Sequence, residues 1–252
     1  MIKEITSVNN SYIKNLLTLK TKQGRNDSNQ FIVEGYHLVE EALKHQVLSA
    51  VLCTDKEVLG KINAQEKYLV SEQVIKKLSS TKPPQNIIGV VNLVNKQELE
   101  SIVKKNELRL LILDDVNDPG NLGTIIRTSA AFGIDAVIAS QETVDYYNDK
   151  VLRATQGAIF KIPLIKGDLV EIISLLKKHH ITILGTSLKS SKSIKEVEKK
   201  AKLAFVVGNE AQGVSDKVLE LCDQNIILPM NNDVESLNVS IAAALIIWEF
   251  NK

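Results

Sequence analysis

The second part of the chain alternates regularly between short apolar runs and helix-like segments, and this alternation limits the possible folds most. Short apolar runs bounded by turn residues are typical of buried strands. Strands that alternate with helices favour a mostly parallel sheet covered on both faces. The sequence therefore predicts an α/β domain over residues 108–252. Its expected strands are Leu108–Asp114, Ala136–Ala139, Lys161–Leu164, Thr182–Gly185, Leu203–Val207 and Asn225–Leu228, and its expected helices are Leu122–Phe132, Tyr147–Thr155, Leu169–His179, Ser193–Val197, Ser215–Leu221 and Val239–Phe250.

Residues 1–95 carry a second, smaller set of strand and helix signals, which predicts a separate small α/β domain. The charged stretch 96–107 lacks glycine and proline and is expected to be a helical connector. Residues 9–25 are expected to form one helix. The further strands expected are Gln30–Glu34, Leu48–Cys53, Lys67–Val70 and Ile87–Leu93, and the further helices are Tyr36–Lys44, Lys56–Ile62 and Ser71–Leu78.

Three expected strands of the second domain lead into loops rich in Gly, Asn, Glu and Ser. The loop sequences are NDPGNLGTIIR (Asn117–Arg127), GNEAQG at the end of Phe205–Gly213, and the polar stretch Pro229–Asn238, which leads into an apolar helix. Asn238 or Ser236 is the expected N-cap of that helix. Ligands of open α/β sheets bind at the carboxyl ends of strands. Three such loops in one domain therefore predict a shared site.

Charge and composition narrow the class of protein. No apolar run approaches the length of a membrane span, and the N-terminus has no signal-peptide core, so a cytoplasmic protein is expected. Cys53 and Cys222 are expected to be buried free thiols, and the four histidines lack metal-ligand spacing, so no metal site is expected. The net charge is only +1, although residues 1–105 hold 15 Lys and Arg against 11 Asp and Glu. Any nucleic-acid footprint must therefore be a local patch.

Three segments resemble, in order and at similar spacing, the motifs of the SpoU/TrmH branch of the SPOUT RNA methyltransferases. They are NDPGNLGTIIRT, VVGNEAQGVS and LPMNNDVESLNVSIAAA, and FIVEGYHLVEEAL resembles the start of the substrate-binding domain that often precedes them. The resemblance covers nearly the whole chain. It implies methylation of a ribose 2′-hydroxyl in RNA with S-adenosyl-L-methionine as cofactor, with rRNA as the expected substrate and tRNA as the alternative. It also implies a homodimer formed through the C-terminal domain and a trefoil knot there.

The same resemblance implies roles for individual residues. Arg127 is the implied catalytic residue. Because a guanidinium is not readily deprotonated, we expect it to bind a backbone phosphate and orient the 2′-hydroxyl rather than accept its proton. Asn232 stands where the family usually has glycine, and asparagine tolerates positive φ next best. The implied assistants of Arg127 are Asn121, Glu210, Ser236 and Asn238, and the implied cofactor-binding residues, acting through their backbone, are Gly208, Leu228, Met230 and Leu237.

Four cations are candidate RNA contacts. Lys20, Lys22 and Arg25 lie in or near the expected helix 9–25, which is either a phosphate-contacting arm or an ordinary solvated face. Arg153 opens the segment RATQG, which resembles a family segment where arginine often contacts RNA. Two other functions stay open at this point. One is a non-catalytic RNA-binding protein that retains the fold, and the other is a nucleotide-binding α/β enzyme of different chemistry.

Overall fold

The computed structural model describes residues 2–93, 99–189, 191–231, 233 and 235–251. The chain forms two compact units. The first contains residues 1–95 together with 147–160, and the second contains residues 96–146 together with 161–252. Asn232 and the first residues of the expected connector, 96–98, lie outside the described residues.

The first unit is built on a five-stranded mixed sheet in the order β1-β4-β3-β5-β2. β1, β4 and β3 run parallel, and β5 is antiparallel to both β3 and β2. The strands are β1 (Ile2–Ile5), β2 (Gln30–Glu34), β3 (Leu48–Cys53), β4 (Glu66–Val70) and β5 (Ile87–Asn92), and the helices are α1 (Ser11–Thr18), α2 (Lys22–Ser28), α3 (Tyr36–Lys44), α4 (Lys56–Lys61) and α5 (Glu72–Leu78). Most expected elements are thus confirmed, whereas β1 was missed.

The expected single helix over residues 9–25 is wrong, because a new helix starts inside it. α1 ends at its C-cap, Leu19, and Thr21 is the N-cap of α2. The Thr21 Oγ1 accepts a hydrogen bond from the Gly24 amide at 3.1 Å. A threonine that caps a helix in this way leaves the helical conformation itself and so separates the two helices.

Residues 147–160 pack within the first unit although they follow β7 of the second. They contain α8 (Asp149–Thr155) and a short 3-10 helix (Ala158–Phe160). The ring of Phe31 in β2 lies 4.7 Å from that of Tyr147 and 6.3 Å from that of Phe160, measured between centroids. Gly157 has φ +82°, and a Cβ there would come within 2.7 Å of the Glu41 Cγ. The sequence placed this segment within 108–252, because periodicity does not reveal which sheet a helix packs on.

The second unit is built on a seven-stranded sheet in the order β10-β12-β9-β11-β6-β7-β8, and every pair in it is parallel. The prediction of a mostly parallel sheet is therefore confirmed. The strands are β6 (Leu108–Asp114), β7 (Ala136–Ala139), β8 (Leu164–Lys166), β9 (Thr182–Thr186), β10 (Lys192–Ser193), β11 (Lys202–Gly208) and β12 (Gln224–Ile227), and the helices are α6 (Leu99–Ile102), α7 (Pro119–Ala131), α9 (Leu169–Lys178), α10 (Asp216–Leu219) and α11 (Val239–Glu249).

Three local predictions in this unit need correction. The expected helix Ser193–Val197 is wrong: β10 pairs there with β12 and leads into a 3-10 helix, Ile194–Glu196. The expected strand Lys161–Leu164 is shifted, since β8 begins at Leu164. The expected connector is helical only over Leu99–Ile102, which is α6. Leu99 and Ile102 are buried in the core of the second unit, so this helix is a part of that unit.

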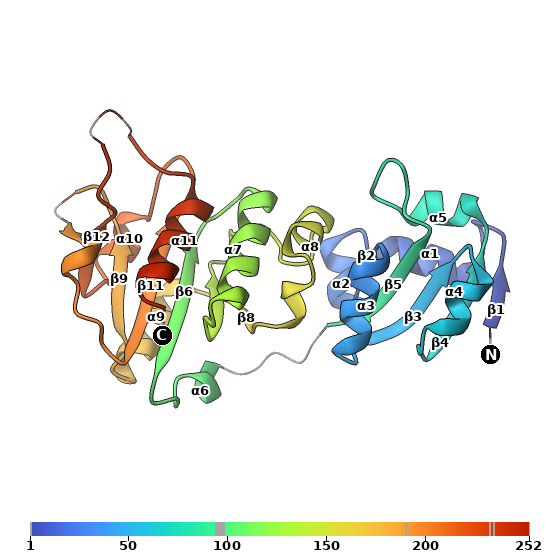
Figure 1. Cartoon of the computed structure of the whole chain (residues 1–252), viewed down its shortest axis with the longest axis horizontal. Helices are drawn as coiled ribbons and strands as arrows, with labels where there is room; N and C mark the ends of the chain where they lie inside the picture. Colours follow the sequence, from blue (N-terminus) through green and yellow to red (C-terminus); the bar gives the residue numbers. More distant parts are fainter. Residues whose placement is uncertain (1, 94–98, 190, 232, 234, 252) are drawn as a thin grey trace. The chain divides into compact units, whose positions relative to one another are not determined.

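The middle of the second unit is its most buried part. Phe205 and Leu110 are fully buried on the neighbouring strands β11 and β6. α7 and α11 lie side by side over this sheet (Figure 1). Gly133 follows the C-cap of α7 with φ +70°, as expected for a helix C′ glycine. None of the helices among the described residues is long and apolar enough to span a bilayer.

Candidate active site

The loops after β6, β11 and β12 meet at one edge of the second unit's sheet. Because the strands are parallel, all their carboxyl ends lie at this edge. The last residues of β6 and β11, Asp114 and Gly208, are directly opposite each other. Side-chain hydrogen bonds described below connect the loops, so the shared site expected from the sequence is present as a structural unit.

A cavity of about 420 Å³ opens at this edge. The loop after β9, at Thr186–Lys189, lines it together with the loops after β11 and β12. Its volume falls within the range of small-molecule sites, and its mixture of apolar wall and polar groups suits an adenosine. All four residues expected to bind the cofactor line it, Gly208, Leu228, Met230 and Leu237, and so do Glu210 and Ser236.

The Thr186–Lys189 loop is a part of the cavity that the sequence reasoning missed. Its signal was present, since the polar stretch TSLKS follows the expected strand Thr182–Gly185. It has the same strand-then-polar-loop form as the three stretches that were singled out.

Gly208 is required by the fold of the loop that follows it. Asn209 and Gly213 form a β-bridge, with N–H···O distances of 3.0 and 2.9 Å. This bridge folds the loop back onto the end of β11. A Cβ on Gly208 would lie 2.1 Å from the carbonyl carbon of Gly213 and from the amide nitrogen of Val214. The close neighbour of Gly208 is thus the protein's own backbone, in a wall of the cavity.

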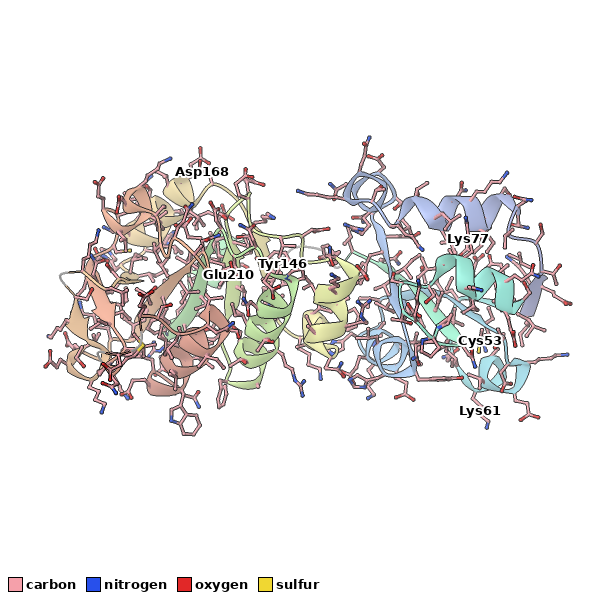
Figure 2. All side chains as sticks on the ribbon, turned by 90° about the horizontal axis from the view of Figure 1, so that it is seen from above. Cys53, Lys61, Lys77, Tyr146, Asp168 and Glu210 are labelled. Atoms are coloured by element: carbon pink, nitrogen blue, oxygen red, sulfur yellow. The ribbon has the colours of Figure 1, made fainter. Side chains whose placement is uncertain are left out.

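A chain of side-chain hydrogen bonds joins the three loops. The Asn121 Nδ2 donates to the Glu210 Oε1 at 3.0 Å, and the Asn238 Nδ2 donates to the Asn121 Oδ1 at 2.9 Å. Glu210 also accepts from the backbone amides of Asn117 at 3.2 Å and Asp118 at 3.1 Å. Figure 2 shows Glu210 beside α7, and its hydrogen-bond partners lie at the start of this helix. The structure therefore brings together Asn121, Glu210 and Asn238 from three separate motifs.

The environment of Glu210 fixes its protonation state. Burial raises the pKa of this carboxyl, but hydrogen bonds from the Asn121 side chain and from the amides of Glu210, Asp118 and Asn117 outweigh burial and lower it. Glu210 is thus ionised at neutral pH and acts as a hydrogen-bond acceptor, too weakly basic to be a good general base. The ionised Glu210 stabilises the folded chain. This stabilisation is fully present at pH above the ordinary carboxyl pKa and is lost as the pH falls through the lowered pKa of Glu210.

The helix caps explain how the two asparagines are presented. Asp118 is the N-cap of α7, because Pro119 fits the first helical position and starts the helix there. The Asn121 side chain is thereby left to bridge Glu210 and Asn238. Asn238 is the N-cap of α11, as predicted, and its Oδ1 accepts from the amides of Ser240 at 2.9 Å and Ile241 at 3.4 Å.

Arg127 lies away from the cavity. It is exposed on the outer face of α7, as are Gly120, Thr124 and Ala131 at helical spacing. It does not line the cavity, and no hydrogen bond or ion pair joins it to another described residue. Arg127, the implied catalytic residue, is therefore accessible to a molecule that binds on this face of the second unit.

The candidate RNA contacts all lie in the first unit. Lys20, Arg25 and Arg153 line one cavity of about 380 Å³, although Arg153 is far from the others in sequence. The Lys20 Nζ donates to the carbonyls of Lys77 at 3.0 Å and Ser79 at 3.2 Å. Arg25 is 8% exposed and donates to the Leu19 carbonyl at 2.9 Å, and Arg153 pairs with Asp149 at 2.8 Å. Lys20 and Arg25 thus donate to backbone carbonyls of the first unit and Arg153 pairs within α8, and Lys20 is exposed like Lys22.

Comparisons with known proteins agree with this arrangement. Residues 109–248 match the SpoU rRNA Methylase family, and residues 10–89 match an MRM3-like substrate binding domain. The chain is 36% identical over 250 residues, 98% of both chains, to the 23S rRNA (guanosine(2553)-2′-O)-methyltransferase RlmP of Bacillus subtilis. It is 33% identical over 98% of its length to an uncharacterized tRNA/rRNA methyltransferase of Synechocystis, 93% of which is covered.

Solved structures give the same result. The crystal structure of an AdoMet-bound rRNA methyltransferase from Sinorhizobium meliloti superposes with a TM-score of 0.88 at 27% identity, over 99% of this chain and 97% of that one. The match therefore includes the segments that form both units and the loops around the cavity. On its sequence, its fold and its three linked loops, this chain belongs to the SpoU rRNA methylase family.

Proposed function

We propose that this protein transfers a methyl group from S-adenosylmethionine to a ribose 2′-hydroxyl in RNA, with rRNA as the substrate. The observation that carries the proposal is the Glu210–Asn121–Asn238 chain of hydrogen bonds beside a cavity of cofactor size. It ties the family's three motifs into one site. The relatives that act on or are named for rRNA support this choice of substrate, and tRNA is the alternative outcome of the test.

The residues of the site divide the work. The cavity would bind the cofactor through the backbone around Gly208 and Met230, and Leu228 and Leu237 would lie against its adenine. The bound cofactor supplies an electrophilic methyl group. Ionised Glu210 orients the Asn121 amide, which in turn accepts a hydrogen bond from Asn238, and Ser236 lines the cavity beside them. Arg127 binds a phosphate of the RNA backbone and orients the 2′-hydroxyl, whose proton leaves to that phosphate or to water.

A ribosomal RNA assay tests this function directly. The purified protein and labelled S-adenosylmethionine are incubated with rRNA, assembled ribosomal subunits and tRNA, and the methylated position is mapped. We expect label in rRNA, at a nucleotide whose 3′ linkage resists alkali because its 2′-hydroxyl is blocked. Label on a base, or a labelled nucleotide whose 3′ linkage alkali still cleaves, would contradict a 2′-O product. Label confined to tRNA would select the alternative substrate.

We further propose a homodimer formed through the second unit. Ile241, Leu245 and Trp248 are 50%, 45% and 65% exposed, and their spacing puts them on one face of α11. The Trp248 ring packs edge-on against that of Phe132, which directly follows α7. An apolar stripe on α11 thus adjoins the helix that presents Arg127. A second copy that covers this surface would bury the stripe and bring Arg127 to a shared active site.

Leu245→Lys is expected to convert this dimer into a monomer and to lower methyl transfer. Leu245 is half exposed, so the lysine costs the isolated chain little, whereas it places a charge in an apolar interface. Light scattering at micromolar protein gives the mass, and the methylation assay gives the rate. Tyr36→Lys, at a residue 43% exposed on α3 of the first unit, is the matched control and should keep wild-type mass. A wild-type protein that is itself monomeric would rule out the dimer.

We propose that the first unit supplies RNA affinity, and Lys22→Gln tests it with the least structural cost. Lys22 is exposed, whereas Lys20 and Arg25 make backbone contacts whose loss would also disturb folding. RNA affinity should fall about equally for all RNA sequences. The slope of the logarithm of the binding constant against the logarithm of the salt concentration should become shallower by roughly 0.7. Filter binding at several salt concentrations measures both. Lys61→Gln on α4 is the control, and an equal effect there would mean that only general charge matters.

The remaining expectations from the family belong to the same proposal. The family implies a trefoil knot in the second unit, and the composition favours a cytoplasmic location. The free thiols of Cys53 and Cys222 are compatible with a reducing compartment. Cys53 is buried inside the first unit (Figure 2), as expected, whereas Cys222 is only partly buried, so its predicted burial is wrong.

A further inference from the structure

Two consecutive aspartates at the end of β6 hold the two ends of the loop that follows β11. Asp114 is 5% exposed, and its Oδ2 accepts hydrogen bonds from the amide of Ser215 at 2.8 Å and from the Ser215 Oγ at 2.7 Å. Ser215 is the last residue before α10, where the loop ends. Its hydroxyl is used by Asp114 instead of capping that helix. The downstream end of the loop is therefore fixed to the neighbouring strand.

Asp115 holds the upstream end. Its carbonyl oxygen accepts a hydrogen bond from the Asn209 Nδ2 at 2.9 Å. Asp115 itself has φ +59°, a conformation that only glycine, asparagine and aspartate adopt readily. Ser140 holds it there: the Ser140 Oγ donates to the Asp115 Oδ1 at 2.6 Å and accepts from the Asp115 amide at 3.0 Å. Ser140 is 8% exposed and sits next to Thr143, with 2.9 Å between their hydroxyl oxygens.

The Asn209 side chain links Asp115 to the turn that contains Glu210. While its Nδ2 is bound to Asp115, its Oδ1 accepts from the amides of Ala211 at 2.9 Å and Gln212 at 3.2 Å. Both ends of the Asn209 amide are thus occupied, and the turn that carries Glu210 is closed. Glu210 then accepts from the first turn of α7, as described above. One continuous path of hydrogen bonds runs from Ser140 through Asp115 and Asn209 to the turn that presents Glu210.

We propose that Asp115, held by Ser140, and Asp114, bound to Ser215, are positioning residues for methyl transfer. They fix the Asn209–Ser215 loop, which is both a wall of the cofactor cavity and the carrier of Glu210, against the strand that leads into the Arg127 helix. None of the four lines the cavity, so they act through the loop. The inference rests on the proposed function, and it identifies the element that keeps the cofactor side and the substrate side of the site in register.

Paired substitutions separate positioning from general stability. Ser140→Ala removes the contacts that hold Asp115, and Asp115→Ala also removes the side chain that tolerates φ +59°. Asp115→Asn retains an Oδ1 acceptor and tolerates the same φ, so it should keep the loop and the activity that Asp115→Ala loses. Asn209→Asp keeps the acceptor for Ala211 and Gln212 but loses the donor to Asp115. Ser129→Ala is the control: Ser129 is fully buried on α7, and its Oγ has no hydrogen-bond partner among the described residues.

Amide hydrogen exchange of Ala211 and Gln212 in the cofactor-free protein is the first measurement, since it requires no activity. It should accelerate about tenfold in Ser140→Ala and Asn209→Asp, because each variant loses part-buried hydrogen bonds that hold this loop. Their kcat should fall by about tenfold or more and their S-adenosylmethionine Kd should rise, at temperatures where circular dichroism shows them folded. Asp115→Asn and Ser129→Ala should stay within about threefold of wild type.

Wild-type exchange and kcat in both Ser140→Ala and Asn209→Asp would overturn the inference. So would an equal loss in Ser129→Ala, or an Asp115→Asn variant as impaired as Asp115→Ala. If Asp115→Ala does not fold, the Ser140 and Asn209 variants decide alone. If the wild-type protein methylates no RNA, the proposed function fails, while the exchange measurement still reports on the loop.

Discussion

Arg127→Ala is expected to abolish most methyl transfer while leaving cofactor binding nearly intact. Arg127 is exposed on α7 and does not line the cavity that holds the cofactor residues. In the proposed mechanism, its removal takes away a contact to RNA in the transition state and no contact to the cofactor. The rate of methyl transfer should fall by about 10³-fold, whereas the S-adenosylmethionine Kd should change by less than about tenfold, or 1.4 kcal/mol.

Single-turnover methylation and calorimetric titration measure the two quantities. Arg127→Lys should recover only part of the rate, because lysine keeps the charge but not the bidentate geometry. Lys178→Ala, at an exposed cation on α9 of the same unit, is the matched control and should keep the wild-type rate. Near-wild-type turnover in Arg127→Ala would remove Arg127 from the mechanism, and a large loss of cofactor affinity would assign it a different role.

Gly208→Ala is expected to have the second large effect, on the cofactor cavity itself. The added Cβ would lie 2.1 Å from backbone atoms of Gly213 and Val214, which cannot move without opening the Asn209–Gly213 bridge. Overpacking of this kind costs about 1–3 kcal/mol. Since the displaced loop forms a wall of the cavity, the S-adenosylmethionine Kd should rise by roughly 100-fold, or about 2.7 kcal/mol.

Gly60→Ala is the matched control for this substitution. Gly60 lies in α4, and a Cβ there would meet nothing within 4 Å. Alanine should therefore be neutral or stabilise the chain by about 0.5–1 kcal/mol. Thermal unfolding and cofactor titration are measured for both variants. Wild-type cofactor affinity in Gly208→Ala would mean that the loop relaxes freely and that its fold does not shape the cavity.

Several features of the site could be read directly from sequence. Asn238 or Ser236 was expected to cap the last helix, and Asn238 does so. Gly208, Leu228, Met230 and Leu237 were expected to belong to one site, and they line one cavity. The reason is that parallel strands have all their carboxyl ends at one edge, so finding the strands in sequence already groups the loops that follow them.

Other features could not be predicted, because they depend on contacts between distant parts of the chain. Arg25 and Lys20 look like surface cations in sequence, yet they donate to backbone carbonyls in the first unit. The sequence also did not reveal that the close neighbour of Gly208 is the backbone of Gly213. The role of Asp115 could not be predicted from the sequence, because it depends on φ +59° and on a hydrogen bond from Ser140, 25 residues away.

The α/β class, the parallel sheet of the second unit and three of the loops at its carboxyl edge could be predicted from the sequence alone. These follow from local periodicity and from turn and cap chemistry, which act over a few residues. That residues 147–160 pack on Phe31 in the first unit could be seen only in the folded chain. A fragment that begins at Lys96 would therefore leave Tyr147 and Phe160 without that partner. Which sheet an apolar segment covers is set by the shape of the surface it meets, and that surface is assembled from residues far away in the chain.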